Sequence, residues 1–95
     1  MGMRDAYLRS IGSRLRAWEA EIDRLERRAA QLSESGRLRA DERVLALRRQ
    51  ARELERLVRR LPEARDAVFE DLKHEVERAA RRLRDAVEAA RTEFL

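Results

Sequence analysis

The feature that most constrains the fold of this chain is a strict pattern of apolar residues in its first third. Spacings of three and four alternate through the first heptad tract, which comprises Leu8, Ile11, Leu15, Trp18, Ile22, Leu25, Ala29 and Leu32. Residues at these spacings form one narrow stripe along an α-helix, and such a stripe is the contact line of a coiled coil. Another helix, of the same chain or of a partner, must cover it.

A second heptad tract follows the first and is out of phase with it. It comprises Ala40, Val44, Leu47, Ala51, Leu54, Val58 and Leu61. Extending the first tract would place its next apolar positions at 36 and 39, whereas the second tract requires 37 and 40. A shift of one residue rotates the apolar stripe by about 100° around the helix axis.

The segment between the two tracts, QLSESGRLRADE at residues 31–42, decides between two architectures. It contains Gly36 but no proline, so a continuous helix would lose only about 1 kcal/mol there. We therefore expect one helix over residues 4–60 that bends near Gly36. The alternative is a break at residues 33–37, with serine as a cap and Gly36 just beyond a helix end. A break would produce a spectrin-like three-helix bundle.

Pro62 predicts a reversal of the chain, because proline disfavours helical geometry at the preceding residue and suits the first turn of a new helix. The last helix is expected over residues 63–94, and its apolar face is broader. That face contains Val68, Phe69, Leu72, Val76, Ala79, Ala80, Leu83, Ala86, Val87, Ala90 and Phe94. The sequence therefore predicts an all-α fold, with residues 1–95 forming a single domain that is an antiparallel helical coiled coil.

The two expected helices differ in length, and this difference predicts association. A helix over residues 4–60 spans about 85 Å and one over residues 63–94 about 48 Å, so the last helix would leave much of the first heptad tract exposed. An exposed apolar strip predicts a homodimer or a higher homo-oligomer, or another coiled-coil protein as partner. The expected oligomer and core contacts are Leu8, Ile11, Leu15, Trp18, Ile22, Leu25, Leu47, Leu54, Val58, Leu72, Val76 and Leu83.

Composition narrows the classes of function. Charged residues make up 44% of the 95 residues and there is no cysteine, which excludes disulfides and thiol chemistry. No apolar run approaches the roughly 18 residues of a membrane-spanning helix, and we expect a cytoplasmic protein without a membrane span. No nucleophile and base stand at a recognisable spacing, so neither a catalytic site nor a cofactor is expected.

The single histidine raises the question of a metal site. His74 follows Asp71 by three residues, and Glu70 and Glu77 lie about one turn to either side. This spacing resembles one half of a carboxylate metal site in a helix bundle. Because the second half is missing, a solvated helix face is the favoured interpretation, and no metal ligand is predicted.

Arginines crowd the middle of the chain and indicate either internal ion pairs or nucleic-acid binding. Residues 34–65 carry ten arginines against six acids, whereas residues 66–95 carry six bases against eight acids. Internal pairing is favoured, and three pairs stand at the favourable helical spacing, Asp23 with Arg27, Glu55 with Arg59 and Glu77 with Arg81. The alternative is sequence-nonspecific binding to phosphate groups. Its expected contacts are Arg48, Arg49, Arg52, Arg56 and Arg59.

Two stretches carry a resemblance to a known family, RDAYLRSIGSRLRAWEAEIDRLERRA near the start and DAVFEDLKHEVERAARRLRDAVEAARTEF near the end. The matching positions are Tyr7, Leu15, Trp18, Ile22, Leu25, the run from Glu70 to Lys73, Val76, Leu83, Ala86, Val87 and Phe94. At these positions the chain resembles small bacterial coiled-coil proteins of the stress-response type. Phe69 and Ala80 stand where that family usually has tryptophan.

The resemblance implies no enzymatic activity and no established molecular mechanism. It also implies a central helix that stays continuous up to a reversal near Pro62. We therefore expect a non-catalytic, oligomerising coiled-coil protein with an interaction or scaffold role in a bacterial stress response.

Overall fold

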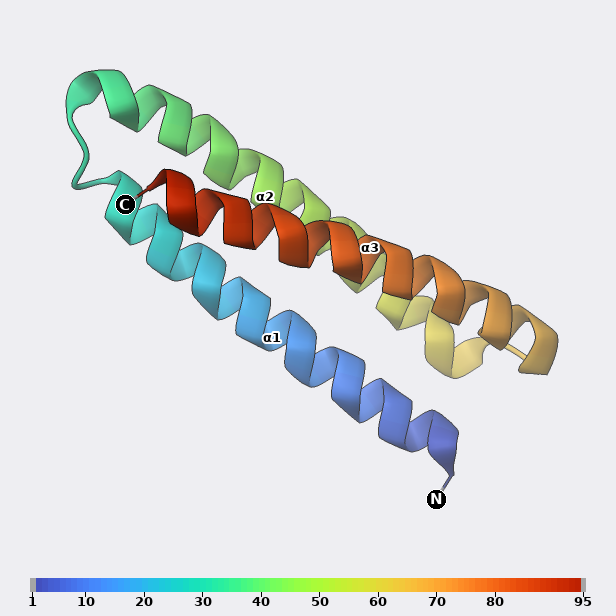
Figure 1. The fold of residues 1–95 in the computed structure, drawn as a ribbon. Helices are drawn as coiled ribbons and strands as arrows, with labels where there is room; N and C mark the ends of the chain where they lie inside the picture. The colour runs from blue at the N-terminus through green and yellow to red at the C-terminus, as the bar shows by residue number, and fades with distance from the viewer. Residues whose placement is uncertain (1, 95) are drawn as a thin grey trace.

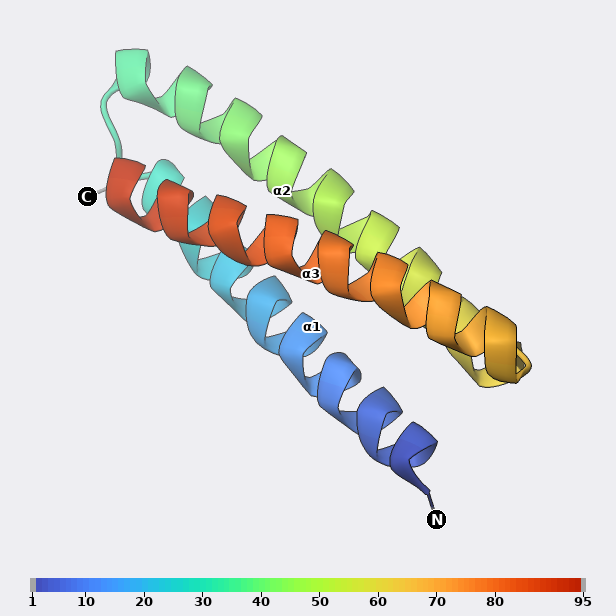
Figure 2. The same cartoon turned by 45° about the vertical axis from the view of Figure 1, so that its right-hand side comes forward.

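The computed structural model describes residues 2–94, and these residues form three α-helices. Helix α1 spans Met3–Ala29, α2 spans Glu34–Arg60 and α3 spans Asp66–Glu93, with a 3-10 turn, η1, at Leu61–Glu63. Helix α2 runs antiparallel to both α1 and α3, so α1 and α3 are parallel (Figures 1 and 2). The all-α class and the reversal next to Pro62 are confirmed.

The continuous helix expected over residues 4–60 is wrong, and the three-helix alternative is the observed architecture. The bundle is 50 Å long, whereas the continuous helix alone would span about 85 Å. Gly36 lies within the first turn of α2 and has no positive φ. It therefore neither bends a long helix nor lies beyond a helix end.

The break occupies residues 30–33, so it overlaps the predicted range of 33–37 only at Ser33. The amide of Gln31 donates to the Arg28 carbonyl at 3.0 Å and that of Leu32 to the Ala29 carbonyl at 3.1 Å, so the chain tightens as α1 ends. Ser33 then takes the extended conformation of an N-cap residue. Serine was expected at a helix cap, and Ser33 occupies that position without a side-chain capping hydrogen bond.

Burial explains why the chain reverses here. Folding α2 back onto α1 covers the first heptad tract within the same chain, and its buried residues are Ile11, Leu15, Ile22, Leu25 and Ala29. Burial of one large aliphatic side chain contributes about 1.5–3 kcal/mol. The free energy that each linking residue would gain by staying helical is below about 1 kcal/mol. The burial of the apolar side chains therefore outweighs the loss of helix at the turn.

The buried stripe of α2 departs from the second heptad tract at one position. It comprises Ala40, Val44, Leu47, Ala51, Leu54 and Leu57, and it continues into η1 at Leu61. Leu57 is 5% exposed, whereas Val58 is only partly buried. Helix α2 packs against both α1 and α3, so its buried face is wider than a heptad seam and includes Leu57 at one edge.

Helix α3 begins later than expected and presents the predicted broad face. Pro62 lies in η1 rather than in the first turn of α3, and this is why α3 starts at Asp66 and not near residue 63. The buried residues of α3 are Phe69, Leu72, Val76, Ala79, Ala80, Leu83, Val87 and Ala90. Val68 was expected on this face, but it is 54% exposed.

One hydrophobic cluster joins the three helices and η1. Its largest fully buried side chains are Ile11, Ile22, Leu47, Leu54, Leu61, Val76 and Leu83. Among residues 2–94 no polar or charged residue is buried. The interior is therefore apolar, and groups able to do chemistry or bind partners lie at the helix junctions and on the outer surface.

Candidate functional site

The residues predicted as oligomer contacts lie in the core of a single chain. Nine of them are buried, Ile11, Leu15, Ile22, Leu25, Leu47, Leu54, Leu72, Val76 and Leu83. Leu8, Trp18 and Val58 are partly buried and pack against the same cluster. The exposed apolar strip from which we predicted association is therefore absent from the bundle, and any partner must bind another surface.

The junction of α1 and α3 carries a polar cluster centred on Glu77. Tyr7 donates a hydrogen bond to Oε2 of Glu77, and Nη1 of Arg14 donates to the same oxygen at 3.1 Å. Burial, together with the hydrogen bond to Glu77, raises the pKa of Tyr7 above its ordinary value. Burial also acts to raise the pKa of Glu77, but the hydrogen bonds from Tyr7 and Arg14 outweigh it and lower that pKa overall.

Three aromatic rings along this junction each have a cation close to the ring face. The distances from the charged group to the ring centre are 4.2 Å for Arg4 and Phe69, 4.9 Å for Lys73 and Tyr7, and 5.4 Å for Arg14 and Trp18. Each such contact contributes about 0.5–1 kcal/mol near a surface. Arg14 and Trp18 both belong to α1, whereas the other two contacts join α1 to α3. Together with Glu77 these two contacts fix how α1 lies along α3, which is a structural role.

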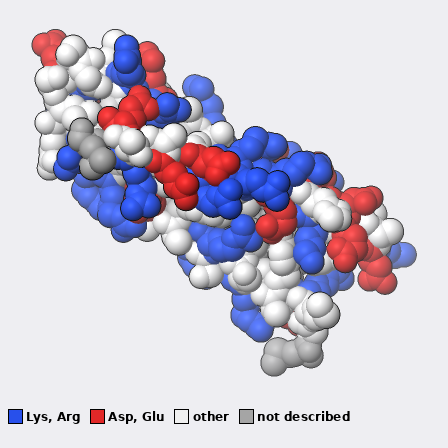
Figure 3. All heavy atoms as spheres, in the orientation of Figure 1, with Lys and Arg blue, Asp and Glu red and all other residues white. Residues whose placement is uncertain are grey.

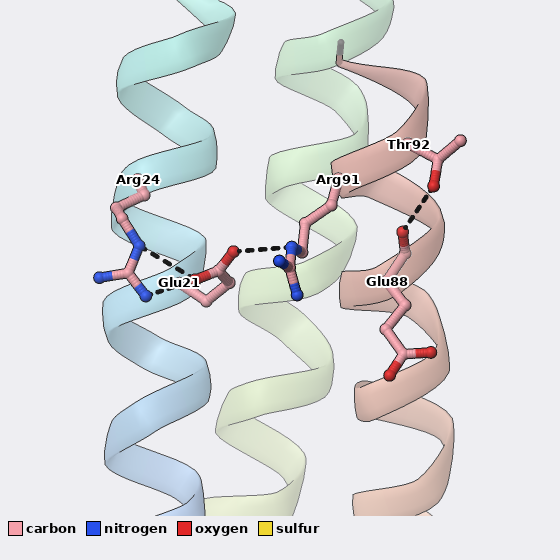
Figure 4. Close-up of polar contacts among 5 residues, drawn as sticks. All are labelled: Glu21, Arg24, Glu88, Arg91 and Thr92. Carbon is pink, nitrogen blue, oxygen red and sulfur yellow. Dashed lines mark hydrogen bonds and ion pairs between the residues drawn. The ribbon is translucent and has the colours of Figure 1, made fainter.

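A groove of about 530 Å³ lies between the C-terminal halves of α1 and α3. It is lined by Arg24, Leu25, Arg28, Glu88, Arg91, Thr92 and Phe94. Figure 4 shows Glu21 between two arginines, with Nε of Arg24 at 3.0 Å from Oε2 and Nε of Arg91 at 3.2 Å from Oε1. The Thr92 hydroxyl donates to the backbone carbonyl of Glu88 at 3.3 Å.

The arginines of this groove are held by groups of the bundle itself. Arg24 and Arg91 share one carboxylate, and Nε of Arg28 donates to the carbonyl of Phe94 at 3.1 Å. The C-terminal ends of α1 and α3 also lie here, and cations offset the partial negative charge of helix C-termini. We therefore interpret the polar contacts around the groove as structural, because they hold the C-terminal ends of the parallel helices α1 and α3 together.

The residues considered for a metal site do not converge around His74 in the described part of the chain. Glu77 pairs with Tyr7 and Arg14, while His74 is exposed. Across residues 2–94 no group of three His, Cys, Asp or Glu side chains is arranged to hold a metal ion. None of the three helices is both long and apolar enough to cross a membrane.

The arginines considered as phosphate contacts lie along α2, and three of the five are paired with acids. Arg48 contacts Asp23 at 2.8 Å and Glu26 at 3.0 Å, both in α1. Arg56 pairs with Glu53 and Arg59 with Glu55. Figure 3 shows basic side chains gathered over the middle of the bundle, with acidic side chains to either side along its length.

The predicted ion pairs at helical spacing are only partly present. Glu55 and Arg59 lie 3.1 Å apart as expected. Asp23 pairs with Arg48 and Glu77 with Arg14, so these two acids bridge to a neighbouring helix instead of to Arg27 and Arg81. Contacts between helices depend on how the helices align, which local spacing does not reveal.

The outer face of α2 points away from the core and is defined by Leu38, Asp41, Glu42, Leu45, Arg49 and Arg52. Leu38 is 68% exposed and Leu45 is 54% exposed. These two leucines are seven residues apart, so they lie on one line along the helix, on the side opposite the buried stripe. In the described chain none of the four charged residues of this face takes part in an ion pair.

Sequence reasoning missed this face, although its signal is present in the sequence. Leu38 and Leu45 fall outside both heptad tracts. Apolar residues on the side of a helix opposite its core stripe are the pattern that indicates a second contact surface.

Comparison with known proteins gives one result. No family model, curated protein or solved structure matches the chain.

Proposed function

We propose that this chain is a non-catalytic helical bundle that associates with a second copy of itself through the outer face of α2. The observation that carries the proposal is the exposure of Leu38 and Leu45 on a helix face that no other part of the described chain covers. One exposed leucine is ordinary on a protein surface. Two on one line, flanked by charges without internal partners, are typical of a helix that packs against another helix.

An interaction or scaffold role follows from association without a reactive site. The resemblance to small bacterial stress-response proteins supports a role in stress, and the cysteine-free sequence suits the cytoplasm. Another coiled-coil protein would bind the same face through the same kind of contact. We therefore propose an interaction or scaffold role in a bacterial stress response.

The mass in solution across a dilution series tests self-association. The wild-type chain is expected to exceed the 11.2 kDa of one copy at high concentration and to return to it on dilution, because a single helix face buries little area. Leu38→Glu combined with Leu45→Glu is expected to stay at the mass of one copy, with its helical circular dichroism unchanged. A wild-type chain that remains a single copy at millimolar concentration would disprove the proposal.

A matched control for these substitutions exists on another helix. Val68 is 54% exposed, as Leu45 is, but it lies in α3 outside the outer face of α2. Val68→Glu is therefore expected to leave the mass at each concentration as in the wild type. Equal loss of association in Val68→Glu and Leu45→Glu would show that general hydrophobicity, and not this face, drives association.

Nucleic-acid binding is a second candidate, because Arg49 and Arg52 are exposed and have no ion pair among the described residues. It is less well supported, since α2 contains no aromatic residue on which a base could stack. Binding through these arginines would fall steeply as salt rises. A gel-shift series with Arg49→Gln and Arg52→Gln tests it, and absence of binding by the wild type at low salt ends this candidate.

A further inference from the structure

The four charged residues of the outer face of α2 are sorted by sign on either side of Leu45. Asp41 and Glu42 precede Leu45 by four and three residues, and Arg49 and Arg52 follow it by four and seven. All four side chains are exposed. We infer that two copies pair through α2 in antiparallel orientation, with a two-fold axis at Leu45. This inference rests on the proposed self-association and adds the geometry of the contact.

The antiparallel arrangement follows from where each charge lies around the helix. Successive residues are rotated by about 100°, so Asp41 and Arg52 lie on one side of the line through Leu38 and Leu45. Glu42 and Arg49 lie on the other side of that line. Each flank of the leucine line therefore carries one acid before Leu45 and one arginine after it.

A two-fold axis perpendicular to α2 brings each flank against the same flank of the second copy. The segment before Leu45 then lies beside the segment that follows Leu45 in the second copy. Asp41 faces Arg52 of the second copy on one flank, and Glu42 faces Arg49 of the second copy on the other. Each of the four charged residues of the outer face thereby meets an opposite charge.

Parallel pairing would produce the reverse result. It would align equal heights of the two helices, so that acids face acids and arginines face arginines. Like charges across a contact disfavour that arrangement, so the charges select the orientation. The leucines provide the attraction. Leu45 packs against Leu45 of the second copy at the axis, and Leu38 packs on the aliphatic part of Arg52 of the second copy.

Disulfide cross-linking tests the position of the axis without background, because the chain contains no cysteine. Leu45→Cys is expected to form a covalent dimer under mild oxidation, since an axis at this residue brings both copies of it together. Leu38→Cys is the matched control, because an antiparallel pair separates its two copies by about 20 Å. Mixing Leu38→Cys with Arg52→Cys is expected to give a cross-linked heterodimer.

Charge reversal provides a second measurement that does not depend on Leu45. The double variant Asp41→Arg with Glu42→Arg and the double variant Arg49→Glu with Arg52→Glu each place one sign of charge on the whole face. Each alone is expected to dimerise at least about tenfold more weakly than the wild type, and an equimolar mixture is expected to restore dimers.

The outcomes separate this inference from the proposed function. A wild-type dimer in which Leu38→Cys cross-links as well as Leu45→Cys would show parallel pairing and overturn the inference alone. Dimers unaffected by both charge reversals would overturn it too. A wild-type chain that never dimerises overturns the inference together with the proposed function.

Discussion

The hydroxyl of Tyr7 donates a hydrogen bond to the carboxylate of Glu77, which lies 70 residues further along the chain. This contact ties the start of α1 to the middle of α3. Arg14 reaches the same carboxylate at 3.1 Å. Burial acts to raise the pKa of Glu77, but its hydrogen bonds with Tyr7 and Arg14 lower it below the ordinary 4.5. The charged form of Glu77 is therefore part of the folded state.

Acid is expected to weaken the bundle through Glu77. A carboxyl group whose pKa is lower in the folded state stabilises the fold above the unfolded value of 4.5, and this contribution is lost as the pH falls through the folded value. Glu77→Gln removes the titrating group, so its free energy of unfolding should fall less steeply than that of the wild type between about pH 5 and 3. Urea unfolding at several pH values measures these slopes.

A matched control for this substitution is Glu88→Gln. Glu88 is exposed, lies in the same helix and has no ion pair among the described residues. If Glu77→Gln and Glu88→Gln show the same dependence on pH, the hydrogen bonds to Glu77 do not stabilise its charged form.

Tyr7→Phe should cost stability at neutral pH and remove a sensitivity to base. A hydrogen bond to a charged group contributes about 1.5–3 kcal/mol, and partial exposure reduces this to about 1 kcal/mol. Burial raises the pKa of Tyr7, so its contribution is fully present below the ordinary 10.0 and declines as the pH rises above that value. Thermal unfolding of the variant should therefore change less than that of the wild type above pH 10.0.

Leu57 and Val58 distinguish the observed packing of α2 from an ideal heptad. Leu57→Ala removes a side chain that is 5% exposed and should cost about 2–5 kcal/mol. Val58→Ala should cost less than about 1.5 kcal/mol, because that side chain is only partly buried. Chemical denaturation gives both values, and a larger loss at Val58 would contradict the observed burial of Leu57 in the core.

Gly36→Ala is expected to stabilise the bundle by about 0.5–1 kcal/mol, because glycine within a helix costs about that much relative to alanine. An added Cβ would lie 3.7 Å from Oγ of Ser33 and 3.8 Å from Cβ of Leu32, which are ordinary contacts. Thermal unfolding measures the change. A loss of stability would instead place Gly36 in the turn between α1 and α2.

The helices and most of their buried residues follow from the sequence, because apolar spacing records which side of a helix lies against a core. The turn near Gln31 does not follow. Its residues favour helix about as well as their neighbours do. The chain turns there because the turn lets α2 pack on α1, which buries Ile22 and Leu47 in one hydrophobic cluster. Gly36 suggested a bend or break at its own position, but a lone glycine is tolerated within the first turn of a helix, and Gly36 lies in the first turn of α2.

The polar contacts across helices were beyond sequence reasoning for a different reason. Tyr7 with Glu77 and Glu21 with Arg91 depend on how far α1 is displaced along α3, and no local spacing encodes that displacement. Leu45 was missed although its exposure was inferable, because both heptad tracts assign it to the side opposite the core. Apolar residues that a core does not need are therefore the signal most worth searching for in chains of this kind.

Ile22→Asp separates the folding role of the first heptad tract from the association proposed for α2. Ile22 is fully buried, and an aspartate there would be a charge without a partner in an apolar core. The cost is several kcal/mol, on the order of 3–5, which is a large part of the stability of a small domain. The variant should lose its cooperative thermal transition in circular dichroism. Leu45→Glu should keep that transition, and its mass in solution should fall to that of a single copy. If Ile22→Asp instead melted like the wild type and only dissociated, the first heptad tract would be an interface between chains and the three-helix core would be wrong.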